Sequence, residues 1–428
     1  MPGYLDPAFD TLALHAGSAP DPTTGARATP LHLSTSFVFD DAAEAAGLFN
    51  LERSGHVYSR LSNPTTAVFE TRMAALEGGV GAIATASGQA ALWLAIITLC
   101  GARDHLVASS QLYGGSHNLL SYTLPRLGIE TSFVPPGDIE AWRAAIRPNT
   151  RLLFGESLGN PGMQVLDIPA VAAVGHAAGL PLLVDATLAT PWLQRPIELG
   201  ADLVMHSATK FLCGHGTVVG GVLVDGGRFP WGDRHPTLTQ PYVGFHDMVF
   251  SEESSVGAFL LRARREGLRD FGACMSPHTA WLLLQGLETL PLRMARHVAN
   301  AQAVAEWLAA QKGVRSVGYP GLTGHASHAQ ARQLLPRGAG AVFSFELEAS
   351  REQGRRFIDG LKLFSHLANV GDAKSLVIHP ASTTHSRMDA GALAQAGIGE
   401  GTIRLSIGLE DPADLIADLK GALKGALR

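Results

Sequence analysis

A single lysine, Lys210, lies between two short apolar runs of the sequence. The run ADLVM and the hydroxyl residues Ser207 and Thr209 precede it, and a glycine-rich turn with the run VVGGVLV follows. An acid, Asp185, ends the earlier run PLLVD, about one strand–helix–strand unit away. Because ligands of open α/β sheets bind at the carboxyl ends of the strands, we expect both side chains to face one crevice. They form either a structural ion pair there or the two ends of a cofactor site.

Pyridoxal 5'-phosphate (PLP) is a cofactor that needs both a lysine and an acid. Its aldehyde forms a Schiff base with a lysine amine, here Lys210, and a carboxylate, here Asp185, keeps its ring nitrogen protonated. Its phosphate favours N–H groups at a helix N-terminus together with hydroxyls or arginine. The sequence supplies such groups at Ser87, Gly88 and Gln89, which open an apolar helix, and at Ser207, Thr209, Tyr58 and Arg60. Each signal is common alone, and their combination predicts a PLP site.

The composition is that of a globular protein with an ample core. The 428 residues carry a formal net charge of −5, and 46% are hydrophobic and 17% charged, which favours neither nucleic acid nor a membrane surface as a partner. The longest apolar run, AALWLAIITLC, is too short to span a bilayer. The three cysteines lie far apart and give no disulfide framework, so we expect reduced thiols and a cytoplasmic location.

Apolar runs of strand length alternate with helix-like segments over roughly the first half of the chain, after an N-terminal stretch rich in Pro, Thr, Ser and Gly. This alternation predicts βαβ units and a large, mostly parallel α/β sheet. A long helical pattern begins near Pro277, and we expect Pro291 to kink or divide it. We therefore predict an extended arm over 1–62, a cofactor-binding α/β domain over 63–280 and a smaller α+β domain over 281–428.

Several stretches of the chain, in order, resemble the Cys/Met metabolism family of PLP-dependent enzymes, also called cystathionine γ-synthase-like. They are HVYSRLSNPT, ASGQAA, LYGGSHN, GESLGNP, LLVDAT, HSATKFLCGHG, LANVGDAKSLVIHPASTTH and IRLSIGLE. The resemblance covers nearly the whole chain and implies the type I fold of PLP-dependent transferases. LHAG, GLRDFGA and GLETLPLR also resemble the branch that joins O-acetylhomoserine to sulfide. Residues 229–247 depart from that branch, which leaves the nucleophile and the acyl group open.

The resemblance implies roles for matching residues. Lys210 would carry the Schiff base and then move protons, Asp185 would pair with the ring nitrogen, and Tyr113 would stack on the ring. The other cofactor-binding residues would be Ser87, Gly88, Gln89, Thr187, Ser207 and Thr209, with Asn160 near the ring hydroxyl and Tyr58 and Arg60 reaching the phosphate from a neighbouring subunit. The substrate would be bound by Arg404, which would clamp its carboxylate, and by Ser375, Asn160 and Tyr58.

Simpler interpretations remain open for some of these residues. Asp185 could cap a helix, Tyr113 could be a core aromatic, Arg404 could serve a structural ion pair, and Ser375 could be a plain loop residue. The pattern GESLG around Ser157 fits a hydrolase elbow, but NPG follows where that motif needs a helix. The histidines of HASH and HPASTTH have no convergent third ligand in the sequence, so we expect no metal site.

The resemblance implies a γ-replacement in methionine biosynthesis, in which O-acetyl-L-homoserine and sulfide give L-homocysteine and acetate. Alternatives are a methionine or homocysteine γ-lyase, a cystathionine γ-synthase, an O-succinylhomoserine sulfhydrylase, and an enzyme that takes sulfur from another thiol or a carrier protein. A non-catalytic PLP-fold protein is disfavoured because Lys210 and Asp185 are both present. An arm that completes a neighbour's site implies a homo-oligomer, namely a tetramer built of dimers.

Overall fold

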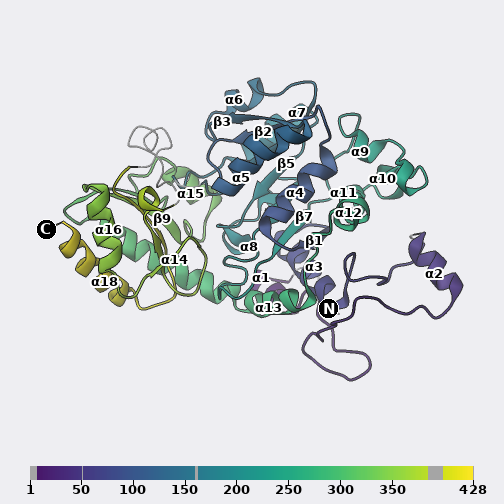
Figure 1. Cartoon of the computed structure of the whole chain (residues 1–428), viewed down its shortest axis with the longest axis horizontal. Helices are drawn as coiled ribbons and strands as arrows, with labels where there is room; N and C mark the ends of the chain where they lie inside the picture. Colours follow the sequence, from purple (N-terminus) through teal and green to yellow (C-terminus); the bar gives the residue numbers. More distant parts are fainter. Residues whose placement is uncertain (1–6, 51, 160–161, 384–398, 428) are drawn as a thin grey trace.

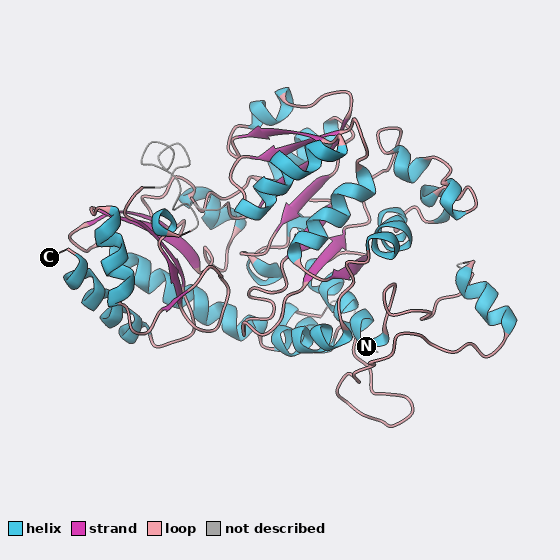
Figure 2. Cartoon of the chain, viewed as in Figure 1, coloured by secondary structure: helices cyan, strands magenta, loops and turns pink. Residues whose placement is uncertain are grey.

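The computed structural model describes residues 7–50, 52–159, 162–383 and 399–427. Figure 1 shows a large sheet flanked by helices, a smaller sheet with its own helices beside it, and an N-terminal segment that extends away from both. Figure 2 shows that the helices lie outside the two sheets. Among the described residues, no helix is long and apolar enough to cross a membrane.

The large sheet has seven strands in the order β1-β7-β6-β5-β4-β2-β3. All run in one direction except β7, which is antiparallel to both of its neighbours. The carboxyl ends of the other six strands therefore meet at one edge, where ligands of such sheets bind. The strands are β1 (Gly81–Thr85), β2 (His105–Ser109), β3 (Glu130–Val134), β4 (Thr150–Glu156), β5 (Leu182–Asp185), β6 (Leu203–His206) and β7 (Gly221–Asp225).

Helices cover both faces of this sheet, so the middle of each central strand is apolar on both faces, as in LLF of β4, LLV of β5 and LVM of β6. Along β5, Leu182 and Val184 pack into one buried cluster and Leu183 into another, because successive side chains point to opposite faces. The helices associated with this part are α3 (Pro64–Glu77), α4 (Gly88–Leu99), α5 (Gly114–Asn118), α6 (Ile139–Ala144), α7 (Ile168–Ala177), α8 (Thr190–Leu193), α9 (Pro236–Thr239), α10 (Phe250–Glu253), α11 (Ala258–Arg262), α12 (Arg269–Phe271) and α13 (Pro277–Glu288).

The smaller sheet has five strands in the order β10-β11-β12-β9-β8, and only the β10–β11 pair is parallel. Its elements are β8 (Val314–Gly318), β9 (Val342–Leu347), β10 (Ser365–His366), β11 (Leu376–Ile378), β12 (Thr402–Ser406), α14 (Leu290–Ala309), α15 (His328–Leu334), α16 (Arg351–Gly360) and α18 (Pro412–Ala426). A large mostly parallel sheet with a smaller C-terminal α+β part is the predicted fold class, and it is confirmed.

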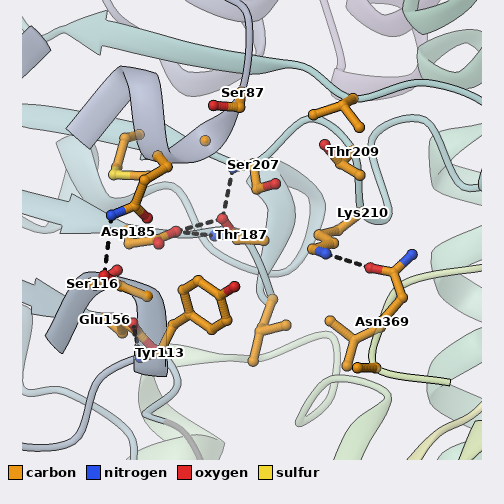
Figure 3. Close-up of a pocket in the computed structure, with 18 of the residues that line it drawn as sticks. Ser87, Tyr113, Ser116, Glu156, Asp185, Thr187, Ser207, Thr209, Lys210 and Asn369 are labelled. Atoms are coloured by element: carbon orange, nitrogen blue, oxygen red, sulfur yellow. Dashed lines mark hydrogen bonds between the residues drawn. The ribbon is translucent and has the colours of Figure 1, made fainter. Parts of the chain in front are cut away.

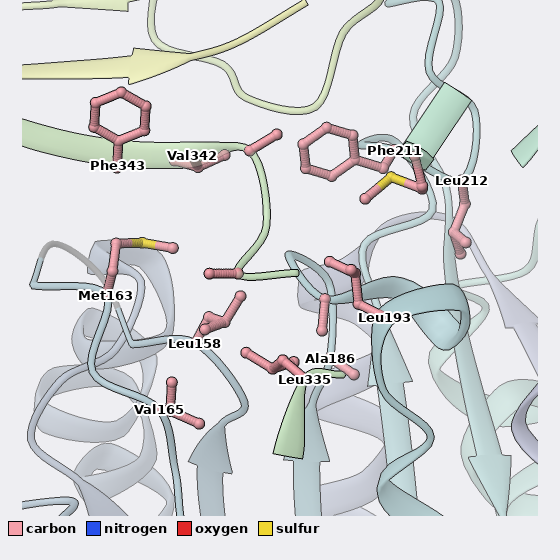
Figure 4. Packing of buried hydrophobic residues seen from close by; sticks show 14 of the residues in the cluster. Leu158, Met163, Val165, Ala186, Leu193, Phe211, Leu212, Leu335, Val342 and Phe343 are labelled. Atoms are coloured by element: carbon pink, nitrogen blue, oxygen red, sulfur yellow. The ribbon is translucent and has the colours of Figure 1, made fainter. Parts of the chain in front are cut away.

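The predicted break at Pro291 is also confirmed. Helix α13 ends at Glu288 and α14 begins at Leu290, with Pro291 in its first turn. A proline is tolerated there because the first N–H groups of a helix have no partner within the helix. One buried cluster contains side chains from both parts of the fold (Figure 4). Leu193 and Phe211 belong to the part with the large sheet, and Val342 and Phe343 to strand β9 of the smaller sheet. This shared core fixes the two parts relative to each other.

The N-terminal segment is only partly an extended arm. Helix α1 (Phe9–His15) packs on the body through the fully buried Ala13, and Arg72 donates hydrogen bonds to the carbonyl of Ala16 and to Ser18. The described residues between Ala16 and Asn63 have few buried side chains and contain one helix, α2 (Ala42–Phe49). In Figure 1 this stretch runs away from both sheets.

Candidate active site

A cavity of about 730 Å³ lies at the carboxyl edge of the large sheet. Its walls come from the residues that follow β1, β2, β4, β5 and β6, and from two parts of the C-terminal region, the segment 368–370 and strand β12. Lys210, Asp185, Tyr113 and Arg404 all line it. The structure thus brings together residues that are more than 200 positions apart in the sequence.

Lys210 lies one turn after the end of β6, and its side chain enters the cavity (Figure 3). Its Nζ donates a hydrogen bond to Oδ1 of Asn369. Burial lowers the pKa of this lysine, and the nearby charge of Arg404 lowers it further, while Asp185 opposes the shift. At a given pH, a larger fraction of this side chain is therefore the neutral amine than in a free lysine. The neutral amine is the form that acts as a base or nucleophile.

Asp185 is the last residue of β5 and faces the same cavity. Its Oδ1 accepts hydrogen bonds from the backbone N–H of Thr187 (2.9 Å) and from the Thr187 hydroxyl. Burial raises the pKa of this carboxyl, although Thr187, His206 and Lys210 all counteract the rise. Helix α8 begins only at Thr190 and its cap is Ala189, so the alternative that Asp185 caps a helix is excluded.

The N-terminus of α4 points at the cavity. Ser87 caps the helix by accepting a hydrogen bond from the N–H of Ala90 (3.1 Å), and Ser87, Gly88 and Gln89 all line the cavity. A Cβ on Gly88 would lie 2.6 Å from the Cβ of Ser207, so only glycine lets the helix approach that residue. The N–H groups of a first helical turn have no partners within the helix, and they make this end suited to an anion.

Two hydroxyl residues next to Lys210 complete this side. Ser207 donates its backbone N–H to the hydroxyl of Thr187 (2.8 Å), which links the loops after β5 and β6. The hydroxyl of Thr209 contacts Gly220, accepting from its N–H at 3.0 Å and donating to its carbonyl at 3.2 Å. Both residues line the cavity, and that they bind the cofactor phosphate stays a prediction.

Tyr113 precedes α5, and its ring lies in the cavity rather than in the core (Figure 3). Its side chain is 56% exposed, which excludes the alternative of a core aromatic. Its backbone N–H donates to Oε1 of Glu156 at 2.5 Å. A Cβ on Gly115 would lie 2.4 Å from the tyrosine ring, so a glycine is needed where the ring folds over its own helix.

Arg404 reaches the cavity from β12 of the smaller sheet. Its neighbours Ile403 and Leu405 are fully buried in the core, and strand alternation places the arginine on the opposite face. Burial lowers its pKa, while Tyr113 opposes the shift. Among the described residues that line the cavity, Lys210 and Arg404 are the only lysine or arginine side chains.

Four predicted residues are not in this group. Ser375 is fully buried outside the cavity lining, where its hydroxyl donates to Glu410 (2.9 Å) and accepts from the N–H of Gly408 (2.8 Å). Tyr58 and Arg60 lie on the N-terminal segment outside the cavity of their own chain, and Arg60 donates to the carbonyl of Arg269. Asn160 lies outside the described residues.

In the part of the chain that the structure describes, the cavity also has four polar side chains that were not predicted from the sequence, those of Ser116, Glu156, Thr217 and Asn369. Glu156 ends β4, directly beside Asp185 on β5, so the rule about strand ends could have found it. Burial and the charge of Asp185 raise its pKa well above the usual value. Asn369 precedes Gly371, where a Cβ would lie 2.9 Å from the Cβ of Lys210. Gly371 lets the loop lie close to Lys210, but the sequence alone does not show which residue the loop contacts.

This set of groups fits PLP. An amine, a buried carboxylate, an aromatic ring, a helix N-terminus and two hydroxyls surround one cavity, and they match an aldehyde, a pyridine nitrogen, a flat ring and a phosphate. Gly88 and Gly115 allow the walls of the cavity to lie close together, because a side chain at either position would collide with Ser207 or with the ring of Tyr113.

Residues 10–424 match a family model described as Cys/Met metabolism PLP-dependent enzyme. The chain belongs to this family. Two relatives in it are an O-acetyl-L-homoserine sulfhydrylase of Leptospira meyeri, 49% identical over 99% of this chain and 98% of its own, and a homocysteine synthase of Schizosaccharomyces pombe, 48% identical over 98% of each. A Campylobacter jejuni crystal structure assigned as an O-acetylhomoserine (thiol)-lyase superposes with a TM-score of 0.94. It is 39% identical, covers 97% of this chain and 99% of its own, and carries N'-pyridoxyl-lysine-5'-monophosphate.

Proposed function

We propose that this PLP-dependent enzyme converts O-acetyl-L-homoserine and sulfide into L-homocysteine and acetate. The observation that carries the proposal is the meeting of Lys210, Asp185 and Arg404 around one cavity, in a chain 49% identical over its length to a sulfhydrylase. The lysine and the acid suit the cofactor, and the arginine suits a substrate that bears a carboxylate.

Bound PLP supplies an aldehyde that bonds to amines and a ring that withdraws electrons from the substrate carbon next to the nitrogen. Lys210 would bind its aldehyde, Asp185 its ring nitrogen and Tyr113 its ring face. Its phosphate would lie at the N-terminus of α4, near Gly88 and Gln89, and would be bound by the hydroxyls of Ser207 and Thr209. Thr187 would hold Asp185 in place through the hydrogen bonds it donates to that carboxylate.

Lys210 Nζ would take the α-proton of the substrate and then move protons between its carbon atoms, while acetate leaves the γ-carbon and sulfide adds there. Its lowered pKa helps, because burial and Arg404 favour the neutral amine that can accept a proton. Arg404 would bind the substrate carboxylate, since its planar fork can donate to both oxygens. Asn369, already bonded to Lys210, would orient that amine.

We also propose that the protein is a homotetramer built of dimers, located in the cytoplasm, in which Tyr58 and Arg60 complete the site of a neighbouring subunit. The segment that carries them exposes large apolar side chains, with Leu33 72%, Val38 98% and Phe49 60% exposed. Such a surface suits a second copy of the chain. The cytoplasmic location rests on three cysteines that are all free in the structure.

Product analysis by mass spectrometry tests the reaction. Purified protein with PLP receives O-acetyl-L-homoserine with and without sulfide, and Lys210→Ala protein serves as the control. We expect homocysteine only with sulfide and only from the native chain. Similar amounts of 2-oxobutyrate in both tubes would show a γ-lyase instead, and no product would point to another acyl group or sulfur donor.

Mixing two inactive variants tests the shared site. Lys210→Ala and Arg60→Ala proteins are combined, unfolded and refolded together. If sites are shared, half of the random dimers are hybrids with one intact site each, and about a quarter of the native activity returns. No recovery, with light scattering showing dimers or tetramers, would mean that each chain completes its own site.

A further inference from the structure

A buried arginine, Arg293, lies behind the turn that carries Lys210. It is in the first turn of α14, only 6% exposed, and does not line the cavity. Its Nη1 donates to the carbonyl of Phe211 at 2.8 Å, and its Nη2 donates to the carbonyls of Gly286 at 2.6 Å and Leu212 at 3.4 Å. Its Nε donates to the hydroxyl of Thr289 at 3.2 Å.

This guanidinium group is hydrogen-bonded to backbone carbonyl groups rather than paired with an acid. Across the part of the chain that the structure describes, no carboxylate forms an ion pair with Arg293, and burial lowers its pKa to about 10. Burying a charge without a counter-charge is unfavourable unless its N–H groups are all well used. The residue therefore stabilises the carbonyl groups that it contacts, and two of them directly follow Lys210.

Those two carbonyls belong to a single helical turn. The N–H of Gly214 donates to the carbonyl of Lys210 (2.7 Å), and the N–H of Cys213 donates to that of Ala208 (3.0 Å). The carbonyls of Phe211 and Leu212 come at the end of this turn, where no further helical N–H is available to them. Arg293 supplies the missing donors from another helix.

The turn is held closely on both sides. A Cβ on Gly286 would lie 2.5 Å from the carbonyl oxygens of both Leu212 and Cys213, and a Cβ on Gly214 would lie 2.0 Å from Arg293 Nη1. On the other side, the N–H of Ala373 donates to the carbonyl of Gly214 at 2.8 Å. The position of the turn, and with it the start of the lysine side chain, thus depends on the junction of α13 and α14.

We propose that Arg293 is a positioning residue for Lys210: it anchors the turn that follows the lysine and so aims Nζ at the reacting atoms. The proposal rests on the role of Lys210 in the proposed function. Since a misplacement of about 1 Å at a reacting group can lower a rate by roughly 100-fold, anchoring this turn has a large effect on catalysis.

The test compares Arg293→Lys with Arg72→Lys. Arg72 is also buried, donates to the backbone carbonyl of Ala16 and pairs with Glu288 at the end of α13 (3.6 Å). None of its hydrogen bonds reaches the turn after Lys210, so the comparison isolates the contacts with that turn. For Arg293→Lys we expect kcat to fall roughly 10- to 100-fold with KM changed much less, and the visible absorption band of the lysine-bound cofactor to titrate at a different pH. We also expect faster amide exchange over residues 208–214 in cofactor-free protein. Arg72→Lys should lower the melting temperature and leave these readouts unchanged.

A second pair of variants tests the same turn without changing any charge. Gly286→Ala places a methyl group against the carbonyl of Leu212, whereas Gly425→Ala, in α18, meets nothing within 4 Å. We expect Gly286→Ala to change kcat, the titration of the absorption band and the amide exchange in the same way as Arg293→Lys does. Gly425→Ala should change none of them. Native kcat, spectrum and exchange in folded Arg293→Lys and Gly286→Ala proteins would overturn the proposal. If native protein makes no homocysteine, the proposed reaction fails, while the spectrum and the exchange still decide the role of Arg293.

Discussion

The two edges of the large sheet both bury carboxylic acids, and they differ in what surrounds the acids. At the carboxyl edge, Glu156 and Asp185 line the cavity beside Lys210. At the amino edge, Asp202 accepts from the N–H of Leu182 (2.8 Å) and contacts the ring of His176 (3.0 Å), and Asp225 accepts from the N–H of Gly227 (2.8 Å). Burial raises the pKa of all four.

A raised pKa therefore does not distinguish the two edges. The carboxyl edge differs in having a cavity of about 730 Å³, a lysine and an arginine within it, and a helix N-terminus aimed at it. Perturbed titration marks a functional site only together with such geometry. If this is right, substitutions at the carboxyl edge should change activity, and those at the amino edge should change stability alone.

The largest effect is expected for Lys210→Ala. Without Nζ no group is in place to bind the cofactor aldehyde or to take the α-proton, so we expect kcat to fall by roughly 10²- to 10⁴-fold. Steady-state kinetics and the loss of the lysine-bound absorption band measure this. A Lys210→Ala protein that still turns over substrate with bound PLP would contradict the role given to this residue.

The second-largest loss of kcat is expected for Asp185→Asn. Its matched control is Asp225→Asn, which makes the same change at the other edge of the sheet. An amide cannot hold the ring nitrogen protonated, so we expect Asp185→Asn to lower kcat roughly 100-fold while Asp225→Asn leaves it within about twofold. Equal losses in kcat would mean that the two edges are not functionally different.

The carboxyl edge was largely predictable because its residues sit at the ends of apolar strands. Lys210 and Asp185 follow β6 and β5, and strand ends of a parallel sheet meet by topology alone. The capping serine Ser87 was found in the same way, from its place before an apolar helix. Local patterns suffice when the sheet itself brings the residues together.

The contribution of the smaller sheet was harder to predict. The stretch LANVGDAKS supplies Asn369 to the cavity, whereas the predicted Ser375 bonds to Glu410 in the interior. Which residue of a loop enters a cavity depends on how the two parts of the fold pack against each other, and no periodicity in the sequence records that packing. Arg404 was predicted from the family resemblance, and strand alternation explains its place in the cavity, opposite the buried Ile403 and Leu405.

Glu156 gives a smaller effect that separates charge from positioning. Burial and the charge of Asp185 raise the pKa of Glu156 and so favour its neutral form. Glu156→Gln is a neutral group that can still accept from the N–H of Tyr113, so we expect kcat at neutral pH to stay within a few-fold. Glu156→Ala leaves the N–H of Tyr113 without its hydrogen-bond partner. This lowers the free energy of unfolding by about 1–3 kcal/mol and removes the contact that holds Tyr113 in place. Kinetics of both variants test this, and a Gln variant as impaired as the Ala variant would show that the carboxyl itself is needed.

Asp225→Asn should change only stability, and only above acidic pH. The folded pKa of Asp225 is about 7 against 3.8 for a free side chain, so between these values the folded state keeps a proton that the unfolded state has lost. Stability therefore falls as pH rises from about 4 to 7 and stays low above that.

The asparagine removes this loss while still accepting from Gly227, so the variant should be the more stable protein at pH 8. Since a tenfold change in a protonation constant is worth about 1.4 kcal/mol, the gain is on the order of 4 kcal/mol. The nearby Asp202 and its partner His176 lie at the same edge of the sheet, and both are retained in the Asp225→Asn variant. The measurement is the difference in melting temperature between variant and native protein at pH 5 and pH 8. A difference that does not grow with pH would show that Asp225 is ionised in the folded protein, and the contrast between the two edges would then rest on the cavity alone.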